Sequence, residues 1–78
     1  MKIVLPMDQY EALLNKCKPQ LPHYEILRNG FIITNNDTRV VEIPCKIEQA
    51  EQLLALAKQT HSAAASSIEA SIRLHREL

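Results

Sequence analysis

The C-terminal stretch, residues 45–78, constrains the fold of this chain most, because it contains neither glycine nor proline. Apolar or small residues recur along it at alternating steps of three and four, the spacing that places side chains on one stripe of an α-helix. Polar and charged residues occupy the opposite side. The pattern predicts one continuous helix over residues 46–76, roughly 46 Å long at about 1.5 Å per residue. The alternative is a break near Ser66, because Ser66 and Glu69 have the spacing of a capping box.

A helix of this length exceeds what residues 1–44 can cover. We therefore expect one small domain over residues 1–78, from which residues 61–78 project as a helical extension used for self-association. The apolar stripe is rich in alanine and serine, and small side chains let two helices approach closely. A parallel or antiparallel homodimer is expected, and the alternative is that the stripe packs on a sheet of the same chain. The expected interface residues are Leu54, Ala57, His61, Ala64, Ile68 and Ile72.

The N-terminus has the pattern of a strand followed by a helix. Residues 3–5 form a short β-type run, and Pro6 ends it in a way that an edge strand tolerates. Asp8 is a good N-cap residue, and Glu11 lies where it supports the cap and the helix dipole. The predicted helix ends before Pro19.

An Asn-Gly pair at residues 29–30 lies between two β-type runs, residues 24–28 and 31–34. Asn-Gly is the strongest short signal for a hairpin, because both turn positions need a positive φ. A second turn-forming cluster at residues 35–38 leads to a third β-type run at residues 39–43. These signals predict three consecutive antiparallel strands.

The chain is therefore predicted to be an α+β protein with a short N-terminal strand, a helix, a three-stranded antiparallel meander and a long C-terminal helix. The last two strands are expected to pair as Thr34–Arg39, Ile33–Val40 and Ile32–Val41. In this register both faces of the sheet are apolar, whereas a solvated antiparallel sheet usually alternates apolar and polar residues. One face should meet the helices, and the other needs a further cover, such as a second copy of the chain.

Charge argues against two classes of partner. The chain has 9 Lys and Arg residues against 9 Asp and Glu residues, and neither half has a surplus. Proteins that bind nucleic acid or an anionic membrane surface usually carry a basic excess on one face. There is no apolar run of about eighteen residues that could span a bilayer, and no N-terminal signal peptide is recognised. Nucleic acid and membranes are therefore disfavoured as partners, and a cytoplasmic location is expected.

The alternative function is a small nucleic-acid-associated regulator of the repressor or antitoxin type. Residues 2–6 and 7–11 resemble the strand-then-helix start of ribbon-helix-helix repressors. The β-type runs that follow depart from that family, which continues with a second helix, so no DNA-contacting residue is assigned. This alternative also requires a basic face that composition does not show.

Candidate chemistry is sparse. Cys45 is expected in the first turn of the long helix beside Lys46, and both a helix N-terminus and a neighbouring cation lower a thiol pKa. A thiol-dependent small enzyme is thus a second alternative, although no histidine lies near Cys45 in sequence to act as a base. His61 and His75 lie about 21 Å apart on a helix, so one chain cannot place both on one metal ion. No catalytic, cofactor-binding or metal-binding residue is assigned, and no cofactor is expected.

The function expected from the sequence is a non-catalytic protein–protein interaction or regulatory module that is not an enzyme. It would work as a homodimer through its long C-terminal helix and bind a further, unidentified protein. The expectation depends on the length of that helix, the two apolar sheet faces and the sparse chemistry.

Overall fold

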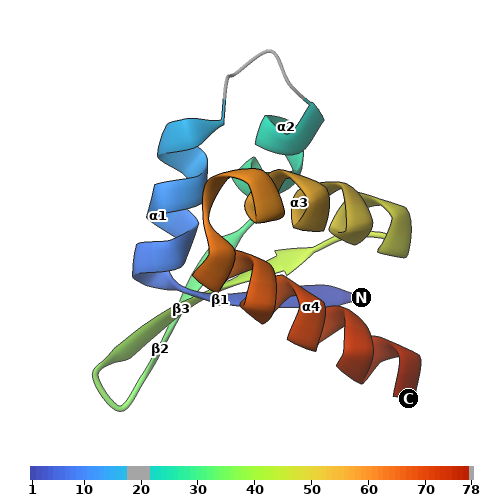
Figure 1. The fold of residues 1–78 in the computed structure, drawn as a ribbon. Coiled ribbons are helices and arrows are strands. Elements are labelled where there is room, and N and C mark those ends of the chain that lie inside the picture. The colour runs from blue at the N-terminus through green and yellow to red at the C-terminus, as the bar shows by residue number, and fades with distance from the viewer. Residues whose placement is uncertain (18–21, 78) are drawn as a thin grey trace.

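The computed structural model describes residues 1–17 and 22–77. Figure 1 shows the arrangement of their helices and strands, which follow in the order β1 (Lys2–Pro6), α1 (Met7–Lys16), α2 (Pro22–Arg28), β2 (Phe31–Asn35), β3 (Thr38–Pro44), α3 (Ile47–Thr60) and α4 (Ser62–Glu77). The predicted α+β class is confirmed. So are the three-stranded antiparallel sheet, the short N-terminal strand followed directly by a helix, and a helical C-terminus.

The strands lie in the order β1-β3-β2, and both pairs are antiparallel. β2 and β3 pair in the predicted register, with Ile32 opposite Val41. Exposure alternates along β1, where Ile3 and Leu5 are fully buried and their neighbours are exposed. Because successive strand residues point to opposite faces, the helices cover one face of the sheet. The other face is open in the part of the chain that the structure describes.

The first run expected to be a strand, residues 24–28, is helical and belongs to α2, so this prediction is wrong. Ile26 and Leu27 are neighbours in sequence, and both are buried. A strand covered on one face buries only one of two neighbours, whereas a short helix can place both against α3 and the core. The Leu27 carbonyl at the end of α2 accepts from the Tyr10 hydroxyl at 2.7 Å and from the Gly30 N–H at 3.1 Å. The third strand of the sheet is β1 instead.

The hairpin turn lies at Asn36 and Asp37, and the Asn-Gly pair at residues 29–30 does not form one. Asn36 and Asp37 have φ values of 50° and 66°. They connect Asn35 and Thr38, which face each other at the end of the β2–β3 pair. Two central residues with positive φ are typical of a type I′ turn, whose twist matches that of the flanking strands. Asn and Asp adopt this left-handed conformation more readily than other non-glycine residues.

Gly30 is explained by close packing, because its φ is not positive. A Cβ atom placed on Gly30 would lie 2.8 Å from Cγ1 of Val41 and 3.1 Å from Cγ1 of Ile43. It would also lie 3.2 Å from the carbonyl oxygen of Leu27. The chain therefore passes from α2 into β2 so close to the core that only a residue without a Cβ fits.

We expect Gly30→Ala to lower the free energy of unfolding by about 1–3 kcal/mol, the usual cost of overpacking a core. Val41 is buried and β-branched, so its side chain cannot rotate away easily. Urea unfolding of the variant and the wild type measures the effect. Because Val41→Ala removes the nearest atom, Gly30→Ala should cost less in that background. Equal costs in the two backgrounds would contradict the packing explanation.

The long C-terminal helix is broken at His61, so the prediction of one continuous helix is wrong. His61 is extended, with φ −156° and ψ 98°. Its backbone N–H donates to the Ala57 carbonyl at 2.7 Å at the end of α3, and its imidazole Nδ1 accepts from the Ala64 N–H at 3.1 Å at the start of α4. A side chain that accepts from the third N–H of a helix acts as its N-cap. The alternative break near Ser66 is not used, because Ser66 lies inside α4.

Because the chain turns at His61, α4 packs back on the same chain. It lies against α3 and along β1 (Figure 1), and four of its apolar side chains are buried: Ala64, Ala65, Ile68 and Ile72. Two hydrogen bonds attach it further, since Ser67 Oγ donates to Gln9 Oε1 at 2.7 Å and Ser71 Oγ accepts from the Val4 N–H at 3.2 Å. The expectation that residues 61–78 project as an extension is therefore wrong for α4, residues 62–77.

Candidate functional site

The predicted helix-pair interface lies mostly inside a single chain. Three of its six residues, Ala57, Ala64 and Ile68, are fully buried. Ile72 is 5% exposed, and Leu54 and His61 are half-buried. A side chain without exposed surface cannot contact a second copy of the folded chain. The prediction that these six residues form an interface between two copies is therefore wrong, because the turn at His61 lets the two halves of the apolar stripe pack on each other. The homodimer itself stays a prediction.

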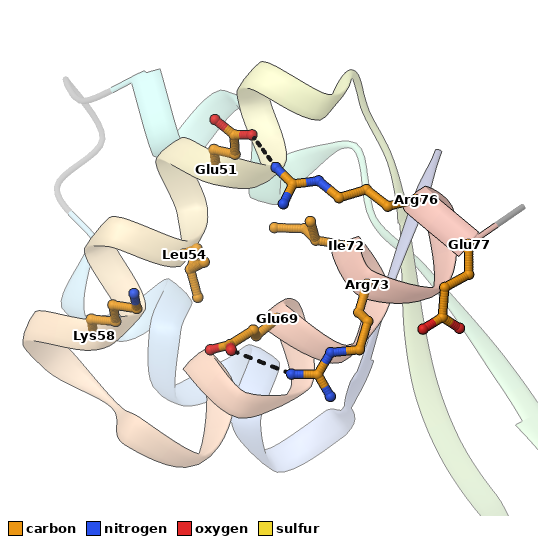
Figure 2. A pocket seen from close by; sticks show the side chains of 8 residues that line it. All are labelled: Glu51, Leu54, Lys58, Glu69, Ile72, Arg73, Arg76 and Glu77. Carbon is orange, nitrogen blue, oxygen red and sulfur yellow. Dashed lines mark hydrogen bonds and ion pairs between the residues drawn. The ribbon is translucent and has the colours of Figure 1, made fainter.

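Two of the six residues, Leu54 and Ile72, reach the floor of an open groove between α3 and α4. The groove has a volume of about 580 Å³, and Figure 2 shows both apolar side chains pointing into it. Charged side chains from both helices form its rim: Glu51, Lys58, Glu69, Arg73, Arg76 and Glu77. All of these charged residues except Glu77 were expected on the solvated side of a single helix. Two stretches of that side come together because the chain turns at His61.

The rim of the groove is electrically balanced. Arg76 lies 3.0 Å from Glu51 and joins the two helices across the groove, and Arg73 lies 3.6 Å from Glu69 within α4. All four side chains are more than half exposed, so each pair contributes little to stability. The described residues that line the groove include no serine, cysteine or histidine. The groove therefore presents paired charges around two aliphatic side chains.

The structure does not place Cys45 in the first turn of a helix, where its thiol pKa was expected to be lowered. Cys45 precedes α3 and is half-buried, and burial raises the pKa of its thiol. The N-terminal ammonium group of Met1 lowers that pKa in part, but burial is the larger cause. Because only the thiolate is a strong nucleophile, a raised pKa opposes the activation expected from a helix N-terminus. Burial raises the pKa of the Cys17 thiol as well.

The histidines do not come together around a metal ion. His61 uses Nδ1 to cap α4, while His75 lies in the last turn of that helix. Over residues 1–17 and 22–77, no group of three or more His, Cys, Asp or Glu side chains is placed to hold a metal ion. Within the same ranges, no helix combines the length and the apolar character that crossing a membrane requires.

The largest exposed apolar side chains gather mainly on the sheet. Phe31 and Ile32 of β2 are 50% and 55% exposed, and Val4 of β1 is 43% exposed. Phe31 lies on the open face with Ile33 and Val4, whereas Ile32 lies on the face of Val41 but beyond the cover of the helices. We call Phe31 and Ile32 the β2 patch. Both faces of the sheet were expected to be apolar, but neither Phe31 nor Ile32 was predicted as a site residue.

The two edges of the sheet differ in how they are protected. β1 ends in Pro6, carries the charged Lys2, and donates its Val4 N–H to Ser71 of α4. β2 has the sequence Phe-Ile-Ile-Thr-Asn and contains neither a charge nor a proline. Charges, prolines and covering elements are the usual means by which proteins prevent an edge strand from pairing with another chain. In the described part of the chain, the edge of β2 away from β3 pairs with no strand.

Comparisons with models of known protein families, with curated proteins and with solved structures gave no significant match.

Proposed function

We propose that this protein is a non-catalytic interaction module that works as a homodimer, joined through its sheet and not through its C-terminal helix. The observation that carries the proposal is the β2 patch, two neighbouring large apolar side chains that stay half-exposed on an uncharged edge strand. Phe31 and Ile32 point to opposite faces and so flank one strand edge, and an unprotected edge strand is a template for pairing with another chain. Formal net charge is zero, so long-range repulsion does not oppose the approach of two copies.

A dimer interface must cover more surface than the two side chains of the β2 patch. A stable interface covers about 800 Å² on each partner, which is roughly a sixth of the 5102 Å² surface of this chain. Burying the remaining half of Phe31 or Ile32 contributes about 1 kcal/mol for each side chain. Association costs at least about 4 kcal/mol in lost freedom of motion. The patch therefore supplies part of the required energy, and backbone hydrogen bonds or further contacts must supply the rest.

The test is the molar mass in solution, measured by light scattering and by sedimentation equilibrium across a wide concentration range. We expect the wild type to reach twice the mass of one chain. Ile32→Lys should stay monomeric at concentrations where the wild type is a dimer, because it places a charge in the β2 patch.

Leu74→Lys is the matched control, since Leu74 is 61% exposed but lies on α4, away from the patch. It introduces the same charge at an equally exposed apolar position and should keep the wild-type mass. A wild type that stays monomeric throughout the series would refute the homodimer. Equal weakening by both variants would refute the assignment to the sheet.

A further inference from the structure

The geometry points to one mode of assembly: two copies pair antiparallel through the edges of β2, around a twofold axis beside Ile33. This inference rests on the proposed homodimer and specifies how it forms. The two three-stranded sheets would join into one sheet of six strands. An antiparallel pair of identical strands is self-complementary, so one contact closes the assembly as a dimer.

The backbone of β2 directs free hydrogen-bonding groups outward. Met1 and Cys45 exchange two hydrogen bonds of 3.0 Å each, so they form a hydrogen-bonded pair that extends the β1–β3 ladder one residue beyond Lys2 and Pro44. Such pairs alternate along an antiparallel ladder, so Ile43 and Val41 also direct their backbone groups to β1. The β3 residues between them then face β2.

The same alternation settles which β2 groups are free. The β2 residues opposite Glu42 and Val40 are Phe31 and Ile33, and these bond to β3. Ile32 and Thr34 therefore direct their N–H and C=O groups away from β3, toward the open edge. An antiparallel strand of a second copy can accept and donate at both residues.

Side-chain exposure distinguishes edge pairing from stacking of the two open faces. Phe31 and Ile32 point to opposite faces of the sheet, yet each is about half-exposed. Two copies stacked by their open faces would cover Phe31 and leave Ile32 in water. A strand added at the edge of β2 lies beside both side chains and covers part of each. Edge pairing is thus the arrangement that uses the whole β2 patch.

An axis beside Ile33 fixes the register of the antiparallel pairing. With Ile33 opposite Ile33 of the second copy, Ile32 lies opposite Thr34, and the turn residue Asp37 lies level with Asn29 of the second copy. Arg28, which precedes that residue, is exposed and lies 4.0 Å from Glu25. Both ends of β2 therefore carry both signs of charge, with Glu25 and Arg28 at one end and Asp37 and Arg39 at the other, so charge does not oppose the antiparallel pairing.

The test substitutes proline at an outward-facing position. Thr34→Pro removes an edge N–H but no hydrogen bond of the β2–β3 ladder, because Thr34 and Arg39 face each other at a pair that is not hydrogen-bonded. We expect the dissociation constant of the dimer to rise at least about tenfold. The fold should be kept, as monitored by circular dichroism and by the melting curve of the monomer.

Ser62→Pro is the matched control. Ser62 is exposed, occupies the first position of α4, where proline is favoured, and follows the extended His61. It should leave the dissociation constant at its wild-type value. A dimeric wild type whose dissociation constant is equally unaffected by Thr34→Pro would overturn the edge pairing and leave the homodimer standing.

A second measurement uses the wild type alone. Amide hydrogen exchange at Ile32 and Thr34 should slow as protein concentration rises. Exchange at the amide of Thr38, which lies beside the turn at the start of β3, should not change. If the amides of Ile32 and Thr34 stayed in fast exchange in the dimer, the two copies would not pair through the edges of β2. That result would overturn the inference. A monomeric wild type would overturn it together with the homodimer.

Discussion

Ala64→Glu is expected to unfold the protein or to lower its free energy of unfolding by about 3–5 kcal/mol, the usual cost of an unpaired buried charge. Ala64 has no exposed surface and lies where α4 packs against α3. A glutamate there must be buried without a partner, must be protonated, or must separate the two helices. Urea unfolding followed by circular dichroism measures the loss.

Ala63→Glu provides the matched control, because Ala63 is the neighbouring residue and is exposed. It lies in the first turn of α4, where a negative charge interacts favourably with the helix dipole. We expect no loss of stability and a gain of at most about 1 kcal/mol. If Ala64→Glu were as stable as Ala63→Glu and changed only the molar mass, the apolar stripe of the C-terminal stretch would be an interface between copies.

Ile68→Ala is expected to cost about 2–5 kcal/mol, as for other large aliphatic side chains removed from a core. Ile68 is fully buried and belongs to the same core as the inward residues of the sheet. The cost combines the lost burial of apolar surface with the cavity that remains. Thermal or urea unfolding at several protein concentrations gives the change and shows whether it depends on association.

The dependence on concentration separates the two possible roles of Ile68. Since Ile68 packs within one chain, the loss should be the same at every protein concentration at which the chain is monomeric. Leu74→Ala, at a position of α4 that is 61% exposed, should change stability by less than about 0.5 kcal/mol. A loss at Ile68 that appeared only under conditions of dimerisation would argue for the interface expected from the sequence.

Local sequence patterns predicted the structure correctly where neighbouring residues determine it. Pro6 and the run before it predicted a strand that leads directly into a helix, and the structure has β1 and α1 there. The pairing of Thr34 with Arg39 followed from the turn cluster between them and is confirmed. In both cases the determining groups lie within a few residues of each other, so a short window of sequence contains the whole cause.

Two predictions failed because the cause lay elsewhere in the chain. The β-type residues 24–28 are helical because α3 and Tyr10 offer a place where Ile26 and Leu27 can both be buried. The C-terminal stretch breaks without a glycine or proline because the imidazole of His61 caps a new helix. Histidine is not among the favoured N-cap residues, so residue type alone did not predict the break.

In the candidate site, too, some features follow from the sequence and others follow only from the tertiary structure. The amino-acid sequence alone determined that an apolar stripe and two apolar sheet faces must be covered, because burial of apolar surface is the main favourable term in folding. Which surface covers which was decided only by the tertiary structure. The turn at His61 folded the stripe onto its own chain, and the helices then occupied one face of the sheet. Phe31 remained exposed because it lies on the open face, and Ile32 because the packed helices do not reach the edge of β2.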